Sequence, residues 1–317
     1  MHDELTPSVR HDAILYDNPE ALLQAAVPFV EDGLSAGDLV VVQVPEHTWS
    51  MLQPQLASTQ EIARGPLNDM YGNPHQALWS LKQLVEQEIR GGATAVRALA
   101  EIPPTSLSVD YKNWGRSEAL LNTAFSDLDY WGLCPYSRND LSADVIDMAV
   151  RTHPWIVDSS SRQANPAFEP TRDYLTRVDS VRASDPLEAQ PPFATQQLNT
   201  AADLTAARDK LEAAFKLTRL TVDRKADLSD ALFEVAINAM LHGGELAHVQ
   251  IWVAQDRILC QVRDSGSGLP DPLTGYQPPD RSSSLTGFGL WSARQLADSL
   301  TTTVEPKGFT VRLSLFF

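Results

Sequence analysis

The first half of the chain alternates helical and strand patterns of apolar residues. Residues 18–34 place apolar side chains such as Leu22, Ala26 and Val30 on one helical face. The next apolar run, Leu39–Val44, is short and rich in valine, which is typical of a strand covered on both faces. Such units repeat along this half, so the pattern predicts an α/β domain with a mostly parallel sheet. The other predicted elements are helices at 46–57, 73–90, 114–127 and 141–151 and strands at 95–102 and 130–136.

A change in composition separates this half from the last third. Residues 157–197 are rich in Pro, Ser, Gln and Ala and have weak periodicity, as in the stretch SDPLEAQPPFATQQ. We interpret them as a semi-extended linker. The sequence therefore predicts one domain over residues 1–156 and a second over residues 198–317.

The last third has a different order of elements. The pattern predicts two helices, two strands, a loop rich in Gly, Pro and Ser, one more helix and two final strands. This order favours an α+β sandwich, with helices on one face of a mixed or antiparallel sheet. The predicted helices are 202–216, 226–242 and 289–299, the strands are 249–253, 258–263, 300–305 and 309–316, and the loop is 264–286.

Composition and charge narrow the classes of function. The 317 residues include 25 Lys and Arg against 41 Asp and Glu, a formal net charge of −16. Direct binding to nucleic acid needs clustered basic residues that neutralise phosphates, so the acidic balance argues against it. The same balance disfavours docking on an anionic membrane. Hydrophobic residues make up 43% of the chain, which is enough to build ordinary globular cores.

Targeting segments, membrane spans and cysteine motifs are not apparent in the sequence. The first twelve residues, MHDELTPSVRHD, are polar, and no apolar run approaches the length of a membrane-spanning helix. Cys134 and Cys260 lie far apart, and no set of Cys and His has zinc-finger spacing. We therefore expect a cytoplasmic protein with neither a disulfide framework nor a structural metal.

Three short segments of the last third stand out as candidates for chemistry. Glu234, Asn238 and His242 recur at i, i+4 and i+8, and so lie on one helical face. The sequence DSGSG at 264–268 follows a predicted strand, and GFG at 287–289 opens a predicted helix. Taken alone, the helical face is typical of polar residues exposed to solvent. The DSGSG segment alone is typical of a turn, and GFG alone is typical of the start of a helix. Their occurrence together, in this order, favours a phosphate-containing ligand held by backbone N–H groups.

These segments resemble the ATP-binding fold of the GHKL superfamily, known as the Bergerat fold. The resemblance covers residues 198–317, with Glu234, Asn238 and His242 as the N box. Asp264, Gly266 and Gly268 form the G1 box, and Gly287 and Gly289 form the G2 box. Within the superfamily the N box FEVAINAMLHGG is most similar to that of the RsbW-type anti-sigma-factor serine kinases.

The resemblance implies a role for each residue of the three boxes. It implies that Asn238 binds Mg²⁺, that Glu234 is the general base toward a protein hydroxyl, and that Asp264 accepts a hydrogen bond from the adenine amino group. Gly266 and Gly268 would shape the adenine side, and Gly287 and Gly289 would lie at the phosphates. The loop 270–286 would be the ATP lid. For His242 a phosphate contact and a favourable helix-end position remain open.

The N-terminal half resembles the MEDS sensory domain, an α/β family with a RecA-like layout. The resemblance rests on HDAILY at 11–16, the following helix and strand, WGRSEALLNTAF at 114–125, CPY at 134–136 and THP at 152–154. His11, Cys134 and His153 are candidates for a redox or metal sensor. We favour the alternative that they are packed histidines and a buried strand thiol.

Together the two resemblances predict a signal-responsive anti-sigma-factor regulator. Its partners would be a sigma factor and an anti-anti-sigma (STAS) protein, which it would phosphorylate on Ser or Thr with ATP and Mg²⁺. RsbW-type domains often dimerise, so the resemblance also implies a homodimer. A non-catalytic, nucleotide-gated binding module is the first alternative. A sensor histidine kinase is a weaker one, because no histidine occurs between His153 and His242. A structural scaffold without ATP binding is the last.

Overall fold

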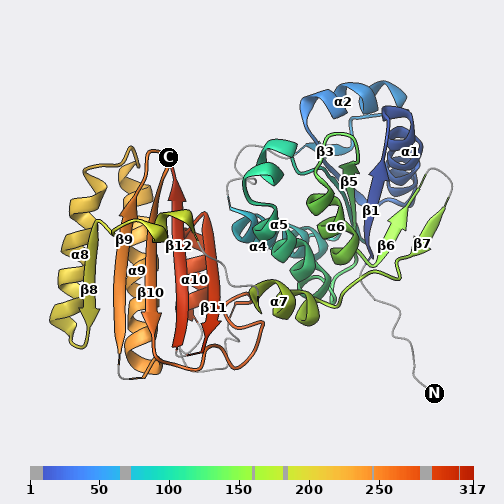
Figure 1. Cartoon of the computed structure of the whole chain (residues 1–317). Coiled ribbons are helices and arrows are strands. Elements are labelled where there is room, and N and C mark those ends of the chain that lie inside the picture. Colours follow the sequence, from blue (N-terminus) through green and yellow to red (C-terminus); the bar gives the residue numbers. More distant parts are fainter. Residues whose placement is uncertain are drawn as a thin grey trace, which may run out of the picture. The chain divides into compact units, whose positions relative to one another are not determined.

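The chain folds into two compact units in the computed structural model, divided between Tyr174 and Leu175. The structure describes residues 10–64, 73–158, 161–180, 185–244, 246–278, 288–306 and 308–317. No helix within these ranges is long and apolar enough to cross a bilayer. Figure 1 shows the elements of each unit.

The N-terminal unit is built on a seven-stranded sheet in the order β3-β2-β4-β5-β1-β6-β7. All pairings are parallel except that of β7 with β6, so the predicted, mostly parallel sheet is confirmed. The strands are β1 (Arg10–Tyr16), β2 (Leu39–Gln43), β3 (Ile62–Arg64), β4 (Val96–Ala100), β5 (Tyr130–Ser137), β6 (Trp155–Val157) and β7 (Arg162–Ala164). The helices are α1 (Pro19–Ala36), α2 (Glu46–Leu52), a 3₁₀ turn at Gln53–Gln55, α4 (Pro74–Arg90), α5 (Pro104–Ala124) and α6 (Ala143–Thr152).

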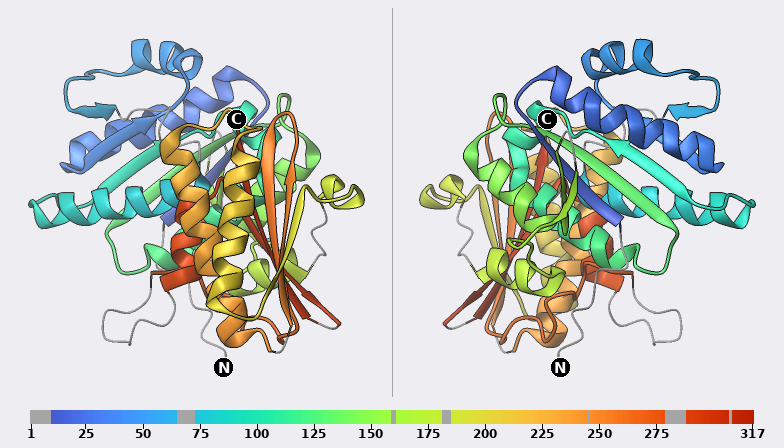
Figure 2. Two further views of the ribbon diagram at one scale, coloured as in Figure 1. Left: turned by 90° about the vertical axis from the view of Figure 1, so that its left-hand side faces the viewer. Right: turned by 90° about the vertical axis from the view of Figure 1, so that its right-hand side faces the viewer.

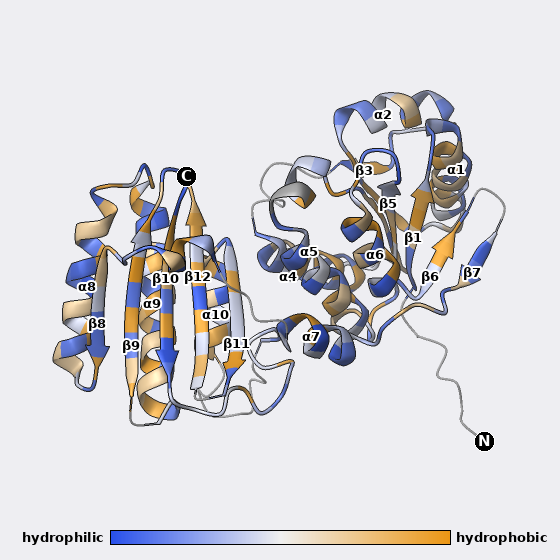
Figure 3. Ribbon diagram, in the orientation of Figure 1, coloured by the Kyte–Doolittle hydropathy of each residue, from blue (hydrophilic) through white to orange (hydrophobic). Residues whose placement is uncertain are grey.

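Helices cover both faces of this sheet, which explains why its central strands are largely buried. Ile14 of β1 and Leu133 of β5 pack in one core cluster with Phe29 of α1. Because side chains alternate along a strand, the neighbouring positions of β1 and β5 face the opposite side, where α5 and α6 lie (Figure 1). Hydropathy colouring shows β1 and β6 as mainly hydrophobic and the outer strand β7 as hydrophilic (Figure 3).

Helix α5 begins ten residues earlier than the periodicity predicts. Its backbone leaves the helical region at Asp110, with φ −151° and ψ 58°, so two helical pieces meet at a kink. The predicted helix at 114–127 corresponds to the second piece. The first piece, from Pro104, lacks a regular apolar stripe and was missed.

The C-terminal unit is a five-stranded antiparallel sheet in the order β11-β12-β10-β9-β8. Helices α8, α9 and α10 pack on one face around a single apolar core, which confirms the predicted α+β arrangement. Figure 2 shows α8 and α9 side by side over the sheet. The elements are β8 (Ala194–Leu198), α8 (Ala201–Phe215), α9 (Val222–His242), β9 (Ala247–Val253), β10 (Arg257–Asp264), α10 (Phe288–Leu296), β11 (Ser299–Glu305) and β12 (Gly308–Phe316).

The segment 157–197, interpreted from composition as a linker, contains folded elements. Besides β7 and most of β8 it holds α7 (Thr171–Ser180) and a 3₁₀ turn at Pro186–Ala189. The 3₁₀ turn is fixed on the helix-free face of the C-terminal sheet, where Arg312 Nη2 donates to Glu188 Oε2 at 3.1 Å. Trp252 Nε1 donates to the Gln190 carbonyl at 3.0 Å on the same face. Composition indicated a linker because these elements are short and are held by distant partners.

Helix α8 begins with a capping box that offers a test of local stability. Asp203 N donates to Thr200 Oγ1 at 3.3 Å, and Thr200 N donates to Asp203 Oδ2 at 2.8 Å. Thr200→Ala is expected to lower the free energy of unfolding by about 1 kcal/mol, because one N-terminal N–H loses its acceptor. Urea denaturation measures the change. Thr205→Ala, an exposed site on the same helix, is the control and should change stability by less than about 0.5 kcal/mol.

Candidate functional site

One pocket of the C-terminal unit brings together most of the residues singled out in the sequence. Its volume is about 420 Å³, and its polar lining includes Asn238, His242 and Asp264. Gly266 and Gly268 also line it. The rest of the lining is mainly apolar and comes from α9, β10, α10 and β12: Val235, Val262, Leu290, Phe309 and Val311. An apolar slot with a few convergent polar groups is the usual form of a small-molecule site.

Helix α9 orients the first group of polar side chains. The helix begins after Thr221, whose hydroxyl accepts from Arg224 N at 3.3 Å, and ends at His242, with Gly243 as its C-cap. Over its 21 residues Glu234, Asn238 and His242 follow one another at single-turn spacing on one face, and the last two line the pocket. Glu234 and Asn238 are half-buried, whereas His242 is exposed. The predicted polar face is therefore present, and its end at His242 is open to solvent.

The first turn of α10 lies directly against this polar face. A Cβ placed on Gly289 would lie 2.7 Å from Glu234 Oε2 and 2.8 Å from Asn238 Nδ2. A larger residue here would have to displace the ends of both side chains. The absence of a side chain thus brings the N-terminal N–H groups of α10 next to the carboxylate and the amide.

Asp264 closes the pocket at the end of β10. Its side chain is buried, and its Oδ1 accepts a hydrogen bond from Gly266 N at 2.7 Å, while Oδ2 has no hydrogen bond from the residues that the structure describes and can accept from a ligand. Burial raises the pKa of this carboxyl group, and the bond from Gly266 opposes that rise. Gly268 has φ +90°, a conformation that favours glycine and turns the chain out of the strand.

The end of α9 and the end of β10 approach each other through glycine. Ser265 Oγ donates to the Gly243 carbonyl at 3.0 Å. A Cβ on Gly243 would lie 2.4 Å from the Asp264 side chain, and one on Gly266 would lie 3.1 Å from the Gly243 Cα. This contact positions Asp264 relative to the polar face of α9. Sequence reasoning missed Gly243, because a glycine after a helix is normally read as a helix terminator only.

Gly243→Ala is expected to lower the free energy of unfolding of the C-terminal unit by about 1–2 kcal/mol, because the added methyl group overlaps the Ala239 carbonyl oxygen and the Asp264 side chain. Urea denaturation measures the effect. The matched control is Gly91→Ala, which also follows a helix with negative φ but whose Cβ would have no contact closer than 3.2 Å. If both substitutions change the free energy of unfolding equally, the overlap at Gly243 does not destabilise the protein.

Two parts of the predicted constellation lie partly or wholly outside the described residues. Gly287, proposed for the phosphate side, is among residues 279–287, which the structure does not describe. Of the predicted lid, 270–286, residues 270–278 are described and contain neither helix nor strand. Pro270 and Thr274 from this stretch line the pocket.

The residues present fit a nucleotide with a divalent cation. The apolar slot suits an adenine ring, and the free oxygen of Asp264 can accept from an exocyclic amine. The amide oxygen of Asn238 is a ligand that Mg²⁺ accepts alongside phosphate oxygens. Gly289 lies in the first turn of α10, and the N–H groups at the start of a helix favour phosphate. In this site the cation, when bound, would neutralise phosphate charge.

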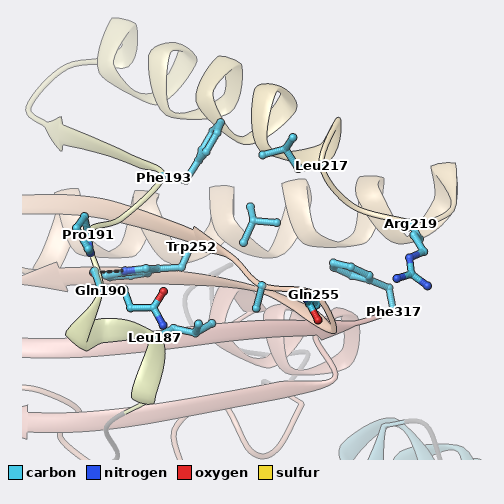
Figure 4. Close-up of a pocket in the computed structure, with 11 residues that line it drawn as sticks. Leu187, Gln190, Pro191, Phe193, Leu217, Arg219, Trp252, Gln255 and Phe317 are labelled. Carbon is cyan, nitrogen blue, oxygen red and sulfur yellow. Dashed lines mark hydrogen bonds between the residues drawn. The ribbon is translucent and has the colours of Figure 1, made fainter.

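A larger hollow of about 780 Å³ lies elsewhere on the same unit. Figure 4 shows its lining, with Trp252 donating to Gln190. Leu187, Phe193 and Phe317 also line it, and none of the predicted site residues does. The larger volume therefore does not mark the candidate site, which is identified by its chemistry.

In the N-terminal unit the structure brings His11, Cys134 and His153 together. A fourth side chain, Glu118 of α5, joins them, and all four are buried. Sequence reasoning missed Glu118, since a single glutamate on an amphipathic helix carries no distinguishing signal. The interpretation of these histidines and the thiol as buried is confirmed, and they lie together as the less favoured alternative, a redox or metal sensor, requires.

Comparison with protein families assigns both halves of the chain. Residues 10–154 match the family described as MEDS, the methanogen/methylotroph DcmR sensory domain. Residues 198–315 match the histidine kinase-like ATPase domain. The chain thus carries a MEDS domain followed by a histidine kinase-like ATPase domain, as the sequence motifs predicted. A search of curated proteins found no match to the chain.

Solved structures with similarity to the chain include histidine kinase domains. The catalytic domain of histidine kinase ThkA is 14% identical, with a TM-score of 0.27, and the match covers 39% of this chain and 95% of that one. The histidine kinase domain of the E. coli osmosensor EnvZ is 19% identical, with a TM-score of 0.24, over 40% and 90% of the two chains.

A third similar structure contains the RsbU and RsbW domains of Rv1364c from Mycobacterium tuberculosis. It is 14% identical, with a TM-score of 0.28, and the match covers 67% of this chain and 48% of that one. The match thus spans about half of that structure. With TM-scores this low, the assignment of the two halves rests on the family matches and on the geometry of the site.

Proposed function

We propose that this chain, a MEDS domain followed by a histidine kinase-like ATPase domain, is a signal-responsive anti-sigma-factor regulator. It would bind ATP with Mg²⁺ in the C-terminal pocket and phosphorylate Ser or Thr on an anti-anti-sigma (STAS) partner. The observation that carries the proposal is the arrangement of Glu234 and Asn238 against Gly289, beside a pocket closed by Asp264. The RecA-like layout of the N-terminal sheet stays a prediction from the resemblance.

Glu234 supplies the base that this reaction requires. In the transfer, the partner's hydroxyl oxygen forms a bond to the γ-phosphorus, the bond from that phosphorus to the β–γ bridging oxygen breaks, and ADP leaves. The hydroxyl proton passes to the Glu234 carboxylate. Phosphoryl transfer depends mainly on positioning and charge stabilisation, so a carboxylate one helical turn from the residue proposed to bind Mg²⁺ is well placed.

The positions of the histidines support this proposal over a sensor histidine kinase. An autophosphorylating kinase needs an accessible acceptor histidine near its ATPase domain. His153, the last histidine before the C-terminal unit, is fully buried and follows α6 of the N-terminal sheet domain. His242 lies within the pocket lining itself. Neither occupies the place of an acceptor on a separate helical hairpin.

Incubation with radiolabelled ATP, Mg²⁺ and STAS-type proteins tests the proposal. We expect acid-stable label on the partner, and no label when a chelator removes Mg²⁺. Acid-labile label on the chain itself would support a histidine kinase instead. ATP binding without any transfer would support the non-catalytic, nucleotide-gated module. A pulldown with this chain as bait, done with and without Mg-ATP, then shows whether a sigma factor binds to it.

A further inference from the structure

Four buried side chains from four separate elements converge in the N-terminal unit. They are His11 of β1, Glu118 of α5, Cys134 of β5 and His153, which follows α6. One nitrogen, oxygen or sulfur atom of each lies within 4.8 Å of those of the other three. None of the four residues is more than 7% exposed. The cluster has no part in the proposed phosphoryl transfer.

The sheet topology explains the convergence. β1 and β5 are parallel neighbours, and Ala13 lies opposite Cys134. His11 is two residues before Ala13, so its side chain points to the same face of the sheet as the Cys134 thiol. Their atoms Nε2 and Sγ are 3.6 Å apart. Helix α5 and the end of α6 add Glu118 and His153 from above that face.

Asn122 fixes the protonation of the His11 ring. Its amide nitrogen donates to the Thr152 carbonyl at 2.8 Å, so its Oδ1 is the atom 3.2 Å from His11 Nδ1. An amide oxygen only accepts, and His11 Nδ1 therefore carries the proton. In the neutral ring the lone pair is then on Nε2, which faces Glu118 and Cys134.

His153 is held in the same tautomer by the backbone. Its Nδ1 lies 2.8 Å from the Ala149 carbonyl oxygen, which can only accept. The proton is therefore on Nδ1, and the Nε2 lone pair points into the cluster. Histidines that bind metals commonly have this arrangement, with the second ring nitrogen donating to a carbonyl or amide oxygen.

When both rings are neutral, the two histidine nitrogens and the carboxylate oxygen that face one another carry no proton, whereas the Cys134 thiol, 3.6 Å from His11 Nε2, carries one. Glu118 Oε2 is 3.0 Å from His11 Nε2 and 3.4 Å from His153 Nε2. Neither this oxygen nor His153 Nε2 has a hydrogen-bond partner among the residues that the structure describes. A proton on His11 Nε2 would provide a hydrogen bond to Glu118 but would leave His153 Nε2 without a partner. A cation between the lone pairs satisfies all of them, and buried polar groups without partners are otherwise rare.

We propose that His11, Glu118, Cys134 and His153 form a zinc site. Tetrahedral zinc, with bonds of about 2.0 Å to nitrogen and about 2.3 Å to sulfur, places its ligand atoms about 3.3–3.8 Å apart. The contacts of 3.4 and 3.6 Å lie within this range, the 3.0 Å contact is slightly shorter, and all four ligand atoms lie within 4.8 Å of one another. Four protein ligands leave no open position, so the ion has a structural or regulatory role and not a catalytic one.

This proposal differs from the expectation of no structural metal. That expectation rested on the spacing of Cys and His along the chain, as in zinc fingers. Here the ligands lie at positions 11, 118, 134 and 153 and meet only through the parallel sheet and two helices. A site assembled in this way has no local sequence signature.

Cobalt binding to the full chain tests the site. The reduced protein is stripped with a chelator and titrated with Co²⁺, whose tetrahedral complexes absorb strongly in the visible. We expect one tightly bound Co²⁺ per chain, a thiolate-to-cobalt charge-transfer band in the near ultraviolet, and displacement by Zn²⁺. A chain that binds no Co²⁺ tightly, or binds it without this band, overturns the proposal.

Variants assign the ligands. Cys134→Ser should lose the charge-transfer band and bind at least about 10-fold more weakly. Cys260→Ser is the matched control, since Cys260 is also a buried strand thiol but lies in the C-terminal unit, and it should keep the band. Asn122→Ala should weaken binding by about 10- to 100-fold while keeping the band, because Asn122 only orients His11. If the Co²⁺ complexes of Cys134→Ser and of the original protein have the same absorption spectrum, the proposed site is wrong. This conclusion holds even if other variants fail to fold.

Discussion

Glu234→Gln is expected to reduce phosphoryl transfer to the STAS partner by about 10²- to 10⁴-fold, the usual contribution of a general base. The substitution keeps the size of the side chain beside Gly289 but removes the carboxylate that takes the hydroxyl proton. Glu234 does not line the pocket itself, so ATP should bind with nearly unchanged affinity. Initial rates with radiolabelled ATP and a fluorescence titration of nucleotide binding measure the two effects separately.

The matched control is Glu212→Gln, which makes the same chemical change at an exposed position of α8. It should leave both the rate and the affinity unchanged. An unchanged transfer rate in Glu234→Gln would remove this residue from the chemistry. If the original chain transfers nothing and both chains bind ATP equally, the domain is a nucleotide-gated binding module.

Asp264→Asn is expected to weaken ATP binding by about 10- to 150-fold, which corresponds to the loss of a hydrogen bond to a charged group worth about 1.5–3 kcal/mol. The asparagine oxygen can still accept from Gly266 N, so the turn should persist. Its NH₂ group then takes the place of Oδ2 and faces the amino group of adenine, donor against donor. Isothermal titration with ATP and Mg²⁺ measures the loss.

GTP provides a second readout for the same variant. Guanine carries an oxygen where adenine has the amino group, so Asp264→Asn should narrow the difference in affinity between ATP and GTP. Asp256→Asn, an exposed carboxylate in the turn before β10, is the control and should not change either affinity. An Asp264→Asn variant with undiminished ATP affinity would show that adenine does not bind at this end of the pocket.

The elements of the last third were predictable from the sequence within a few residues. Helix α9 was predicted at 226–242 and spans Val222–His242, and β10 was predicted at 258–263 and spans Arg257–Asp264. The apolar periods of 3.6 and 2 residues are local properties, so they are readable wherever an element has a single buried face. The extra first turn of α9 is polar and begins at the Thr221 cap, which the apolar pattern does not mark.

The short elements between the two halves could not be predicted from apolar periodicity. Strand β7 has three exposed residues, yet Arg162 at its start donates to buried Asp12 at 2.6 and 3.0 Å. Strand β8 alternates weakly and exists because it pairs with β9. Elements of this kind are fixed by partners at least 49 residues away in the chain, and no local period indicates them.

By itself the sequence determined which residues share a local face or turn. It placed Glu234, Asn238 and His242 on one side of a helix and Asp264 at the end of a strand, since those relations follow from backbone periodicity alone. Only the tertiary structure decided what those groups meet. The fit of Gly289 against α9, the contact of Gly243 with Asp264, and the meeting of His11 with Glu118 depend on the packing of distant elements. Packing decides such contacts because a side chain's neighbours across a core are set by sheet order and helix placement, which chain spacing does not encode.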